Sequence, residues 1–183
     1  MPGIENRAVV RKIGDKTGIA SSEAARVADL EITQMPGHLI RRLQQASVAI
    51  FDNETRQAGF DLTPVQFAAL TMIAASPGLD QATLAQGIAY DRVTIGGVVD
   101  RLELKGLIRR EIAEKDRRAR KLFLQPDGEQ ALQEVRPVVH AIQGAILQGL
   151  SPEENEQLCR LLRKALDAVG DVSRTPVHQL KSA

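Results

Sequence analysis

Basic side chains gather in one short stretch of this 183-residue chain, where their chemistry would be phosphate binding. The segment from Asp91 to Lys121 holds ten basic and six acidic residues, a net charge of +4, while the rest of the chain holds 14 basic and 17 acidic residues, a net charge of −3. Residues 115–121 alone carry five positive charges and one negative charge. A local basic patch on a nearly neutral protein is typical of a surface that contacts nucleic-acid phosphates, and a solvated, merely charged turn is the alternative interpretation.

Residues suited to other chemistries are sparse. A single cysteine, Cys159, excludes an internal disulfide framework and a cysteine-rich zinc site. The three histidines, His38, His140 and His178, lack the spacing of metal ligands, and no nucleophile motif, paired acid and base or phosphate loop is present. Aromatic residues make up only 3% of the chain, too few for a platform that stacks single-stranded nucleic acid. We therefore expect a protein that is not an enzyme and uses no cofactor or metal.

The distribution of apolar residues predicts a protein without a membrane segment. No apolar run approaches the roughly 18 residues that a transmembrane helix needs. The N-terminal residues also lack the apolar core of a secretory signal. These features favour a location in the cytoplasm.

Capping and turn residues divide the middle of the chain into three short helices. Thr63, which precedes a proline, predicts the start of the first helix. Asp80 is placed to cap a second helix of about two turns. Asp91 is placed to cap a third helix with Thr94 at its N3 position, and Gly106 followed by leucine predicts where that helix ends. The second and third of these helices, joined by a tight turn, predict a helix-turn-helix.

A hairpin is predicted directly after these helices. Residues 108–112 and 121–124 have the composition of two short strands, and the basic cluster falls at the tip between them. A helix-turn-helix followed by a two-stranded basic hairpin is a winged helix. The predicted fold is therefore mainly α with a small β-hairpin wing, and its winged helix-turn-helix domain spans residues 63–125.

Three long amphipathic helices flank the predicted winged helix. They are expected at residues 38–58, from residue 126 to about 148, and from a capping box at Ser151 onwards. The second of them has a heptad-like apolar seam, a pattern typical of a helix that packs along a partner helix. The seam consists of Leu132, Val135, Val139, Ile142 and Ile146. The third helix is lined by Leu158, Leu161, Leu162, Ala165, Leu166 and Val169.

These apolar stripes are longer than a small winged-helix core can cover. We therefore predict that residues 35–62 and 126–172 form a helical dimerisation region and that the protein is a two-fold symmetric homodimer. Residues 1–34 are expected to form an N-terminal arm, with a short helix in its second half. Residues 173–183 are expected to form a flexible tail.

Two motifs with matching spacing give this chain a family resemblance. Residues 100–110 are similar to the end of the recognition helix and the first wing strand of the MarR family of bacterial transcription regulators. The residues DRR at 116–118 and LQPDG at 124–128 are similar to that family's wing signature. The resemblance covers residues 36–169 and implies a ligand-responsive, dimeric regulator, most often a repressor, that binds a pseudo-palindromic operator in double-stranded DNA. The residues PGHLIRR at 36–42 resemble the branch of the family that controls aromatic-acid catabolism.

The chain departs from the family pattern at two places. Gln125 stands where the family usually has a threonine as helix cap, so this helix start is expected to be less well capped. Gly96 and Gly97 stand where many members have Thr-Arg on the recognition helix. Contacts to DNA should therefore shift toward Arg92, Thr94 and the wing, and the glycines allow the helix backbone to approach DNA closely.

The resemblance assigns roles to individual residues of the predicted winged helix. Arg92 is expected to contact a guanine and Thr94 a base edge or methyl group in the major groove. Arg101 is expected at a phosphate, with an ion pair to Asp116 or another wing acid as the alternative. Asp116 itself is expected to be structural, because a carboxylate repels phosphate. The residues expected at phosphates or in the minor groove are Arg117, Arg118 and Arg120.

A small aromatic carboxylate is the expected effector. In the family, effectors of this class bind between the dimerisation helices and the winged helix. His38 and Arg42 are four residues apart and share a helix face, where the arginine could hold a carboxylate and the histidine a ring substituent. Phe67 and Met72 are candidates for the apolar walls. The alternatives are that Arg42 pairs with a protein carboxylate and that Phe67 is ordinary core.

Two further interpretations stay open beside the ligand-responsive regulator. Some family members sense oxidants through cysteine, so a redox regulator centred on Cys159 is one alternative, although a buried and inert thiol fits its apolar neighbours better. The other is a winged helix that binds protein and never touches DNA, which the charge of the wing argues against.

Overall fold

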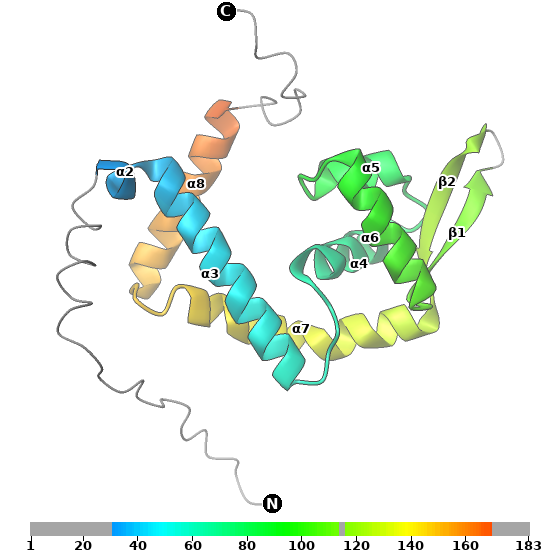
Figure 1. The fold of residues 1–183 in the computed structure, drawn as a ribbon, viewed down its shortest axis with the longest axis horizontal. Helices are drawn as coiled ribbons and strands as arrows, with labels where there is room; N and C mark the ends of the chain where they lie inside the picture. Colours follow the sequence, from blue (N-terminus) through cyan, green and yellow to red (C-terminus); the bar gives the residue numbers. More distant parts are fainter. Residues whose placement is uncertain (1–30, 114–115, 170–183) are drawn as a thin grey trace, which may run out of the picture. The chain divides into compact units, whose positions relative to one another are not determined.

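The chain folds mainly into α-helices, and the residues that the structure describes also contain one two-stranded antiparallel sheet (Figure 1). The structure, a computed structural model, describes residues 31–113 and 116–169, with only the backbone for residues 113 and 116–119. In chain order the elements are α2 (Glu31–Gln34), α3 (Pro36–Gln57), α4 (Pro64–Ala75), α5 (Gln81–Gly87), α6 (Arg92–Leu104), β1 (Ile108–Ala113), β2 (Asp116–Leu124), α7 (Pro126–Ile146) and α8 (Pro152–Val169). None of the described helices is both long and apolar enough to cross a membrane. The predicted fold class, a winged helix-turn-helix with flanking helices, is confirmed.

Two compact units divide the chain after Leu43, within helix α3. In the first unit, α2 leads into α3 through backbone hydrogen bonds such as that from Leu39 N to the Met35 carbonyl at 3.0 Å. The large apolar side chains of this unit are exposed in the single chain: Ile32, Met35, Leu39, Ile40 and Leu43. Of the predicted N-terminal arm, only residues 31–34 are described, and the short helix expected in it falls outside the described residues.

In the second unit, side-chain caps start the helices where the sequence predicted them. The Thr63 hydroxyl accepts from the Gln66 backbone N–H at 3.3 Å, and the Gln66 side chain accepts from the Thr63 N–H at 3.1 Å, which completes a capping box. Asp80 accepts from the Thr83 N–H at 2.8 Å at the start of α5. The turn from α5 to α6 passes through Ala89 at φ 57°, the left-handed conformation that a tight turn between two helices demands. These local hydrogen bonds define the helix boundaries of the helix-turn-helix without any contact to residues distant in sequence.

The end of α6 and the start of α7 meet at Leu107. Gly106 has φ 71°, and the Leu107 N–H donates to the Leu102 carbonyl at 3.0 Å, which is the predicted Schellman stop. The Leu107 carbonyl in turn accepts from the Gln125 N–H at 3.0 Å. A Cβ atom at Gly128 would lie only 2.0 Å from that carbonyl oxygen, so glycine is what lets α7 approach α6 so closely. Gln125 makes no side-chain capping hydrogen bond, as expected from its departure from the family pattern.

The hairpin is longer than the sequence predicted. Strand β2 begins at Asp116, so most of the basic cluster lies within a strand and not at the tip. The expected strand at 121–124 was too short because residues 116–120 have no apolar alternation in their sequence that would mark a strand. At the base of the hairpin, the Leu122 N–H donates to the Leu79 carbonyl at 3.0 Å and the Leu122 carbonyl accepts from Gly78 N–H at 2.8 Å. These bonds tie the wing to the loop between α4 and α5.

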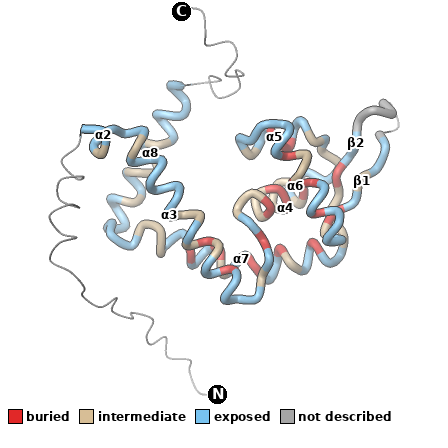
Figure 2. Tube along the Cα trace, viewed as in Figure 1, coloured by how far each residue is buried: buried red, intermediate tan, exposed pale blue. Residues whose placement is uncertain are grey.

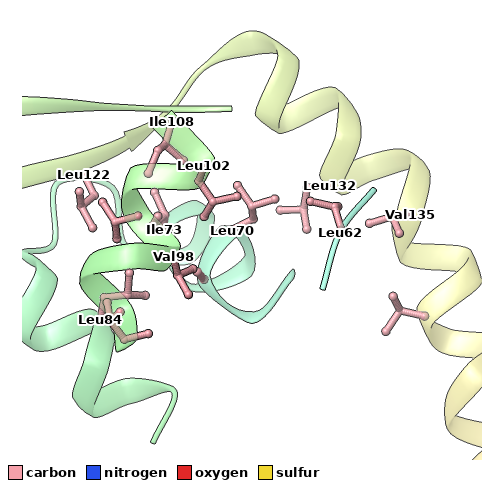
Figure 3. Close-up of a cluster of buried hydrophobic side chains, with 14 of the residues drawn as sticks. Leu62, Leu70, Ile73, Leu84, Val98, Leu102, Ile108, Leu122, Leu132 and Val135 are labelled. Atoms are coloured by element: carbon pink, nitrogen blue, oxygen red, sulfur yellow. The ribbon is translucent and has the colours of Figure 1, made fainter. Parts of the chain in front are cut away.

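One hydrophobic core joins the helices of the second unit to the hairpin and α7 (Figure 3). Figure 3 shows side chains from α4, α5, α6, both strands and α7 converging on the same interior. Fully or almost fully buried members include Leu70, Ile73, Leu84, Leu102, Ile108, Leu122 and Val135. Because both strands contribute to this core, the wing is fixed relative to α6, which positions the two elements for a common surface.

The two C-terminal helices differ in how far their residues are buried (Figure 2). On α7, the predicted seam is buried inside the chain's own core at Leu132, Val135, Val139 and Ile142. That seam is therefore not available to a partner helix, contrary to its heptad-like pattern. Helix α8 starts with the predicted capping box, in which Ser151 N–H donates to the Glu154 carboxylate at 2.8 Å. It buries no residue, and it leaves an exposed apolar side at Leu161, Leu166 and Val169.

Candidate nucleic-acid interface

The N-terminus of α6 is organised by Asp91. Its carboxylate accepts from the Thr94 backbone N–H at 2.8 Å and from the Thr94 hydroxyl at 2.5 Å. The hydroxyl, followed by the backbone N–H, lowers the pKa of Asp91 below its ordinary value of 3.8. The cap is thus ionised at neutral pH, and the proton of the Thr94 hydroxyl is engaged by it.

Helix α6 packs one side against the core and exposes the opposite side, which includes a valine and a glycine, to solvent. Its buried positions are Ile95, Val98, Val99 and Leu102. On the opposite side, Val93 is 87% exposed, and it precedes the half-buried Gly96 and Gly97 at helical spacing. The sequence analysis did not single out Val93, because an exposed valine has no polar group to mark it. The spacing of the four buried positions already placed it opposite the core.

The two arginines of α6 that the sequence predicted at DNA are exposed. The positive charge of Arg92 helps to lower the pKa of Asp80, after the larger effect of the Thr83 backbone N–H. Arg101 forms no ion pair with a described carboxylate, and its Nη2 lies 3.6 Å from the position that a Cβ of Gly97 would take. The Arg101 guanidinium therefore lies back along the solvent side of the helix toward its N-terminus.

Three other basic residues of the same segment form ion pairs with carboxylates of the chain. Lys105 pairs with Asp61 at 2.6 Å, and this bond lowers the pKa of the Asp61 carboxyl. Arg109 pairs with Glu111 at 2.8 Å and stacks over the Phe123 ring, 4.7 Å from its centre.

Arg110 is the most strongly engaged of the three. It binds both Asp100 and Glu103 of α6, the second at 2.9 Å, and the bond to Asp100 is the main cause that raises the Arg110 pKa. These pairs fasten the base of the wing to the recognition helix. Sequence spacing did not identify them, since the partners come from a helix and a strand.

The predicted wing contacts lie on β2. Arg120 is exposed at the inner part of the basic run. Arg117 and Arg118 belong to the strand backbone, and their side chains fall outside the described residues, as does that of Asp116. The alternative pairing of Arg101 with Asp116 accordingly stays a prediction.

The predicted effector residues belong to different units. His38 and Arg42 are on α3 in the first unit, where His38 is half-buried and Arg42 exposed. Phe67 and Met72 are on α4 in the second unit, and both already pack there. The Phe67 ring lies 6.2 Å from that of Phe51, and Met72 fills the space beside Gly87, where a Cβ would come within 2.1 Å of its Cε. For these two residues the structure is consistent with the ordinary core interpretation.

A cavity that the sequence did not predict lies in the second unit. It has a volume of about 620 Å³, within the range of small-molecule sites. Its apolar walls come from α4, the base of the hairpin and α7: Ile73, Ala74, Phe123, Leu124 and Leu132. Its polar lining consists of Arg109, Glu129, Gln133 and Arg136. Among the described residues, no group of three His, Cys, Asp or Glu side chains is arranged to hold a metal ion.

Comparisons with known proteins agree with this architecture. A model described as the MarR family matches residues 60–119. The transcriptional regulator HosA of Escherichia coli O111:H- is 33% identical over 131 residues, which cover 72% of this chain and 94% of HosA. Among solved structures, the PcaV transcriptional regulator of Streptomyces coelicolor in complex with its natural ligand is 31% identical with a TM-score of 0.70, over 78% of this chain and 99% of PcaV.

A second solved structure concerns the control of DNA binding by a small molecule. BpsR of Bordetella bronchiseptica, described in terms of regulation of its DNA binding by 6-hydroxynicotinic acid, is 30% identical with a TM-score of 0.69. The match covers 74% of this chain and 96% of BpsR. These similarities extend over the winged helix and the flanking helices alike, because they span nearly the full length of the shorter proteins.

Proposed function

The chain belongs to the MarR family of transcriptional regulators, and from this we propose that it is a dimeric repressor that binds a pseudo-palindromic operator and is released by a small aromatic carboxylate. Its relatives are transcriptional regulators and not enzymes. Regulation of DNA binding by an aromatic acid is described for BpsR, which is 30% identical to this chain. A protein that acts on chromosomal DNA would work in the cytoplasm.

The observation that carries the proposal is the joint orientation of α6 and the wing. Arg110 ties the base of β1 to two carboxylates of α6, and both strands share the core of that helix. The exposed side of α6 and the basic strand β2 are thus parts of one rigid body. A helix in the major groove with a basic hairpin beside it can contact base edges and phosphates at the same time.

Within this proposal each predicted residue keeps its role. Arg92 contacts a guanine, and Thr94 contacts a base edge through its methyl group or the hydroxyl oxygen. Arg101, with its guanidinium lying over Gly97, contacts a phosphate or base at the middle of the helix. The wing contacts to phosphate or the minor groove come from Arg117, Arg118 and Arg120.

A second subunit is needed to cover apolar surface that one chain leaves exposed. Leu161, Leu166 and Val169 of α8 are 48%, 70% and 56% exposed, and the first unit exposes a further apolar set. Exposed apolar side chains gathered on one helix face are typical of a protein–protein interface. A two-fold dimer would cover both sets and place two copies of α6 about 34 Å apart, one turn of DNA.

The effector has two candidate locations. The first is the predicted site, in which Arg42 holds the carboxylate and His38 a ring substituent, with Phe67 and Met72 as walls. The second is the cavity of about 620 Å³, where Arg136 pairs with no described carboxylate and stands beside apolar walls. In the cavity, Arg136 next to apolar walls is the complement of an aromatic carboxylate.

Salt dependence tests the proposed DNA binding. Duplex DNA from the chain's own promoter is titrated with the full chain at increasing salt, and affinity should fall linearly on logarithmic axes, because bound phosphates release counterions. Arg118→Ala should weaken binding to all sequences alike and reduce the slope by about 1 per subunit. Arg92→Ala should instead relax preference at one base pair by about 1–3 kcal/mol. Affinity that ignores salt would favour the winged helix that binds protein.

A thermal-shift screen tests the proposed effector and separates the two locations. Hydroxybenzoates, cinnamates and pyridine carboxylates are added to the full chain, since a bound ligand stabilises the folded state by RT ln(1 + [L]/Kd). Arg42→Ala should abolish the shift and the release from DNA while leaving DNA affinity intact. Loss of the shift in Arg136→Ala instead would move the site to the cavity.

The redox alternative makes a different prediction for the same assay. Cys159 is half-buried on α8, and its thiol donates to the Asn155 side-chain oxygen at 3.5 Å. A ligand-responsive repressor should keep its DNA affinity in peroxide and in the Cys159→Ser variant. Release by peroxide that disappears in Cys159→Ser would replace the aromatic carboxylate by an oxidant as the signal.

A further inference from the structure

The solvent side of helix α6 carries an apolar patch formed by Val93, Gly96 and Gly97. These positions are spaced i, i+3 and i+4, so they lie together on the helix surface. The core positions of α6 point the other way, and Val93 is 87% exposed. Helix α6 is the predicted recognition helix, and N-terminal residues of such a helix are the ones that reach base edges.

Packing does not explain the two glycines. A Cβ at Gly96 would come no closer than 3.4 Å to any other group, the side-chain nitrogen of Gln81, and a Cβ at Gly97 no closer than 3.6 Å, to Arg101. Both are ordinary contacts with flexible polar side chains. Glycine is among the poorest helix formers, so alanine at either position would suit the isolated fold better. What the glycines provide is a helix surface without Cβ atoms, which a neighbouring molecule can approach once the flexible side chain of Arg101 moves aside.

Three polar side chains surround the patch, those of Arg92, Thr94 and Arg101. The Thr94 hydroxyl donates to the Asp91 carboxylate. Arg92 is exposed next to Val93, and the Nη2 atom of Arg101 lies 3.6 Å from the position that a Cβ of Gly97 would take. The exposed apolar group at this helix end is the Val93 side chain, and one turn behind it the flexible side chain of Arg101 is the nearest neighbour of Gly97. In the major groove of DNA, the 5-methyl of thymine is the apolar group that base pairs present.

We propose that the patch of Val93, Gly96 and Gly97 binds the 5-methyl group of a thymine in each half-site of the operator. This inference rests on the proposed function, since it specifies what α6 contacts within the DNA. The Val93 methyls supply the apolar contact, and the missing Cβ atoms allow the helix to lie deep enough for the thymine to touch it. Thymine at this position becomes a determinant of operator choice that none of the arginines supplies.

Replacing single thymines by deoxyuridine tests the inference, because this change removes the 5-methyl group and nothing else. Duplexes that the full chain selects from a random library are resynthesised with dU at one position at a time. At one position per half-site, dU should weaken binding by the wild type about fourfold, the cost of one lost methyl contact. Val93→Ala should bind the dT and dU duplexes equally well.

Leu104→Ala is the matched control for loss of an exposed apolar side chain. Leu104 is 88% exposed on the same side of α6, but three turns, or about 16 Å, further along the helix. This variant should keep the wild-type sensitivity to dU. If no single dU changes wild-type affinity, or if Val93→Ala stays as sensitive as the wild type, the patch does not contact a thymine methyl, although the proposed function stands. If the full chain selects no duplex at all, the proposed function itself fails.

Gly97→Ala tests the role of the bare backbone separately. The substitution should raise the thermal stability of the protein, because alanine favours the helix and meets no close neighbour. It should also weaken binding to the selected duplex by about tenfold or more, since a Cβ would hold the helix away from the base. Unchanged DNA affinity in this variant would overturn the close approach, and a loss of stability would show that the glycine serves the fold.

Discussion

Gly128→Ala is the substitution whose effect the structure specifies most closely. Gly128 is buried in the first turn of α7, where an added Cβ would lie 2.0 Å from the Leu107 carbonyl oxygen and 2.9 Å from its carbon. Non-bonded atoms need roughly 3.5 Å, so the start of α7 would have to move by more than about 1 Å. That movement would also strain the hydrogen bond from Gln125 N–H to the same carbonyl, which is 3.0 Å long.

The magnitude follows from the sum of these effects. Overpacking a close contact costs about 1–3 kcal/mol, and a weakened backbone hydrogen bond adds about 1 kcal/mol. The better helix propensity of alanine returns up to about 1 kcal/mol. We therefore expect Gly128→Ala to lower the free energy of unfolding by about 1–4 kcal/mol.

Gly144→Ala in the same helix is the matched control. A Cβ at Gly144 would meet nothing within 4 Å in the chain, so this variant should be more stable than the wild type by about 0.5–1 kcal/mol. Urea unfolding of all three proteins is followed by circular dichroism at one fixed protein concentration, because dimer stability depends on concentration. If Gly128→Ala unfolds at the wild-type urea midpoint, the close approach of α7 to Leu107 is wrong.

Three further predictions address the cap, the wing and the dimer. Thr94 lowers the pKa of Asp91, so the difference in free energy of unfolding between the wild type and Asp91→Ala should be largest above pH 3.8 and shrink as the pH falls below it. Urea titrations at several pH values measure this difference, and a difference that does not change with pH would contradict the prediction. Arg110→Ala removes two partly exposed ion pairs, so it should cost about 1 kcal/mol in unfolding without changing operator preference in binding assays. Leu166→Asp on α8 should convert the dimer to monomers in sedimentation experiments, whereas Leu104→Asp on α6 should not.

The sequence predicted those features that depend on neighbours within one helical turn. The caps at Thr63, Asp80 and Asp91 and the stop at Gly106 are all confirmed, because each rests on a hydrogen bond between residues at most five apart. The same reasoning predicted that Gln125 would cap poorly. Hydrogen bonds of this kind depend on residues close in sequence, so they can be predicted from the sequence, and no tertiary contact changes them here.

Features that depend on contacts distant in sequence were predicted less well. The apolar seam of α7, from Leu132 to Ile142, has the spacing of a helix paired with another subunit, yet it is buried within one chain. Apolar periodicity indicates that one face of a helix is buried, but it does not indicate whether the same chain or a second subunit covers that face. The outer half of β2 was missed for a related reason, since its charged sequence shows no alternation, and its pairing with β1 shifts register between Ile112 and Ala113.

Which basic residues are available to bind DNA is likewise decided by tertiary structure and not by composition. Of the ten basic residues between Asp91 and Lys121, three neutralise carboxylates inside the fold: Lys105, Arg109 and Arg110. The partners of Lys105 and Arg110 come from other parts of the chain, and that of Arg109 lies two residues along the same strand, so a net charge along the chain does not show which bases are already paired. Among the described side chains, Arg92 and Arg101 are exposed on α6, and Arg120 and Lys121 are exposed on β2. Beside these basic residues, α6 carries Val93 and two glycines, with the Arg101 side chain lying over Gly97, at the point where the helix would come closest to the bases. Affinity would then arise at the charged side chains and part of the sequence preference at the apolar patch, where contacts do not weaken with salt.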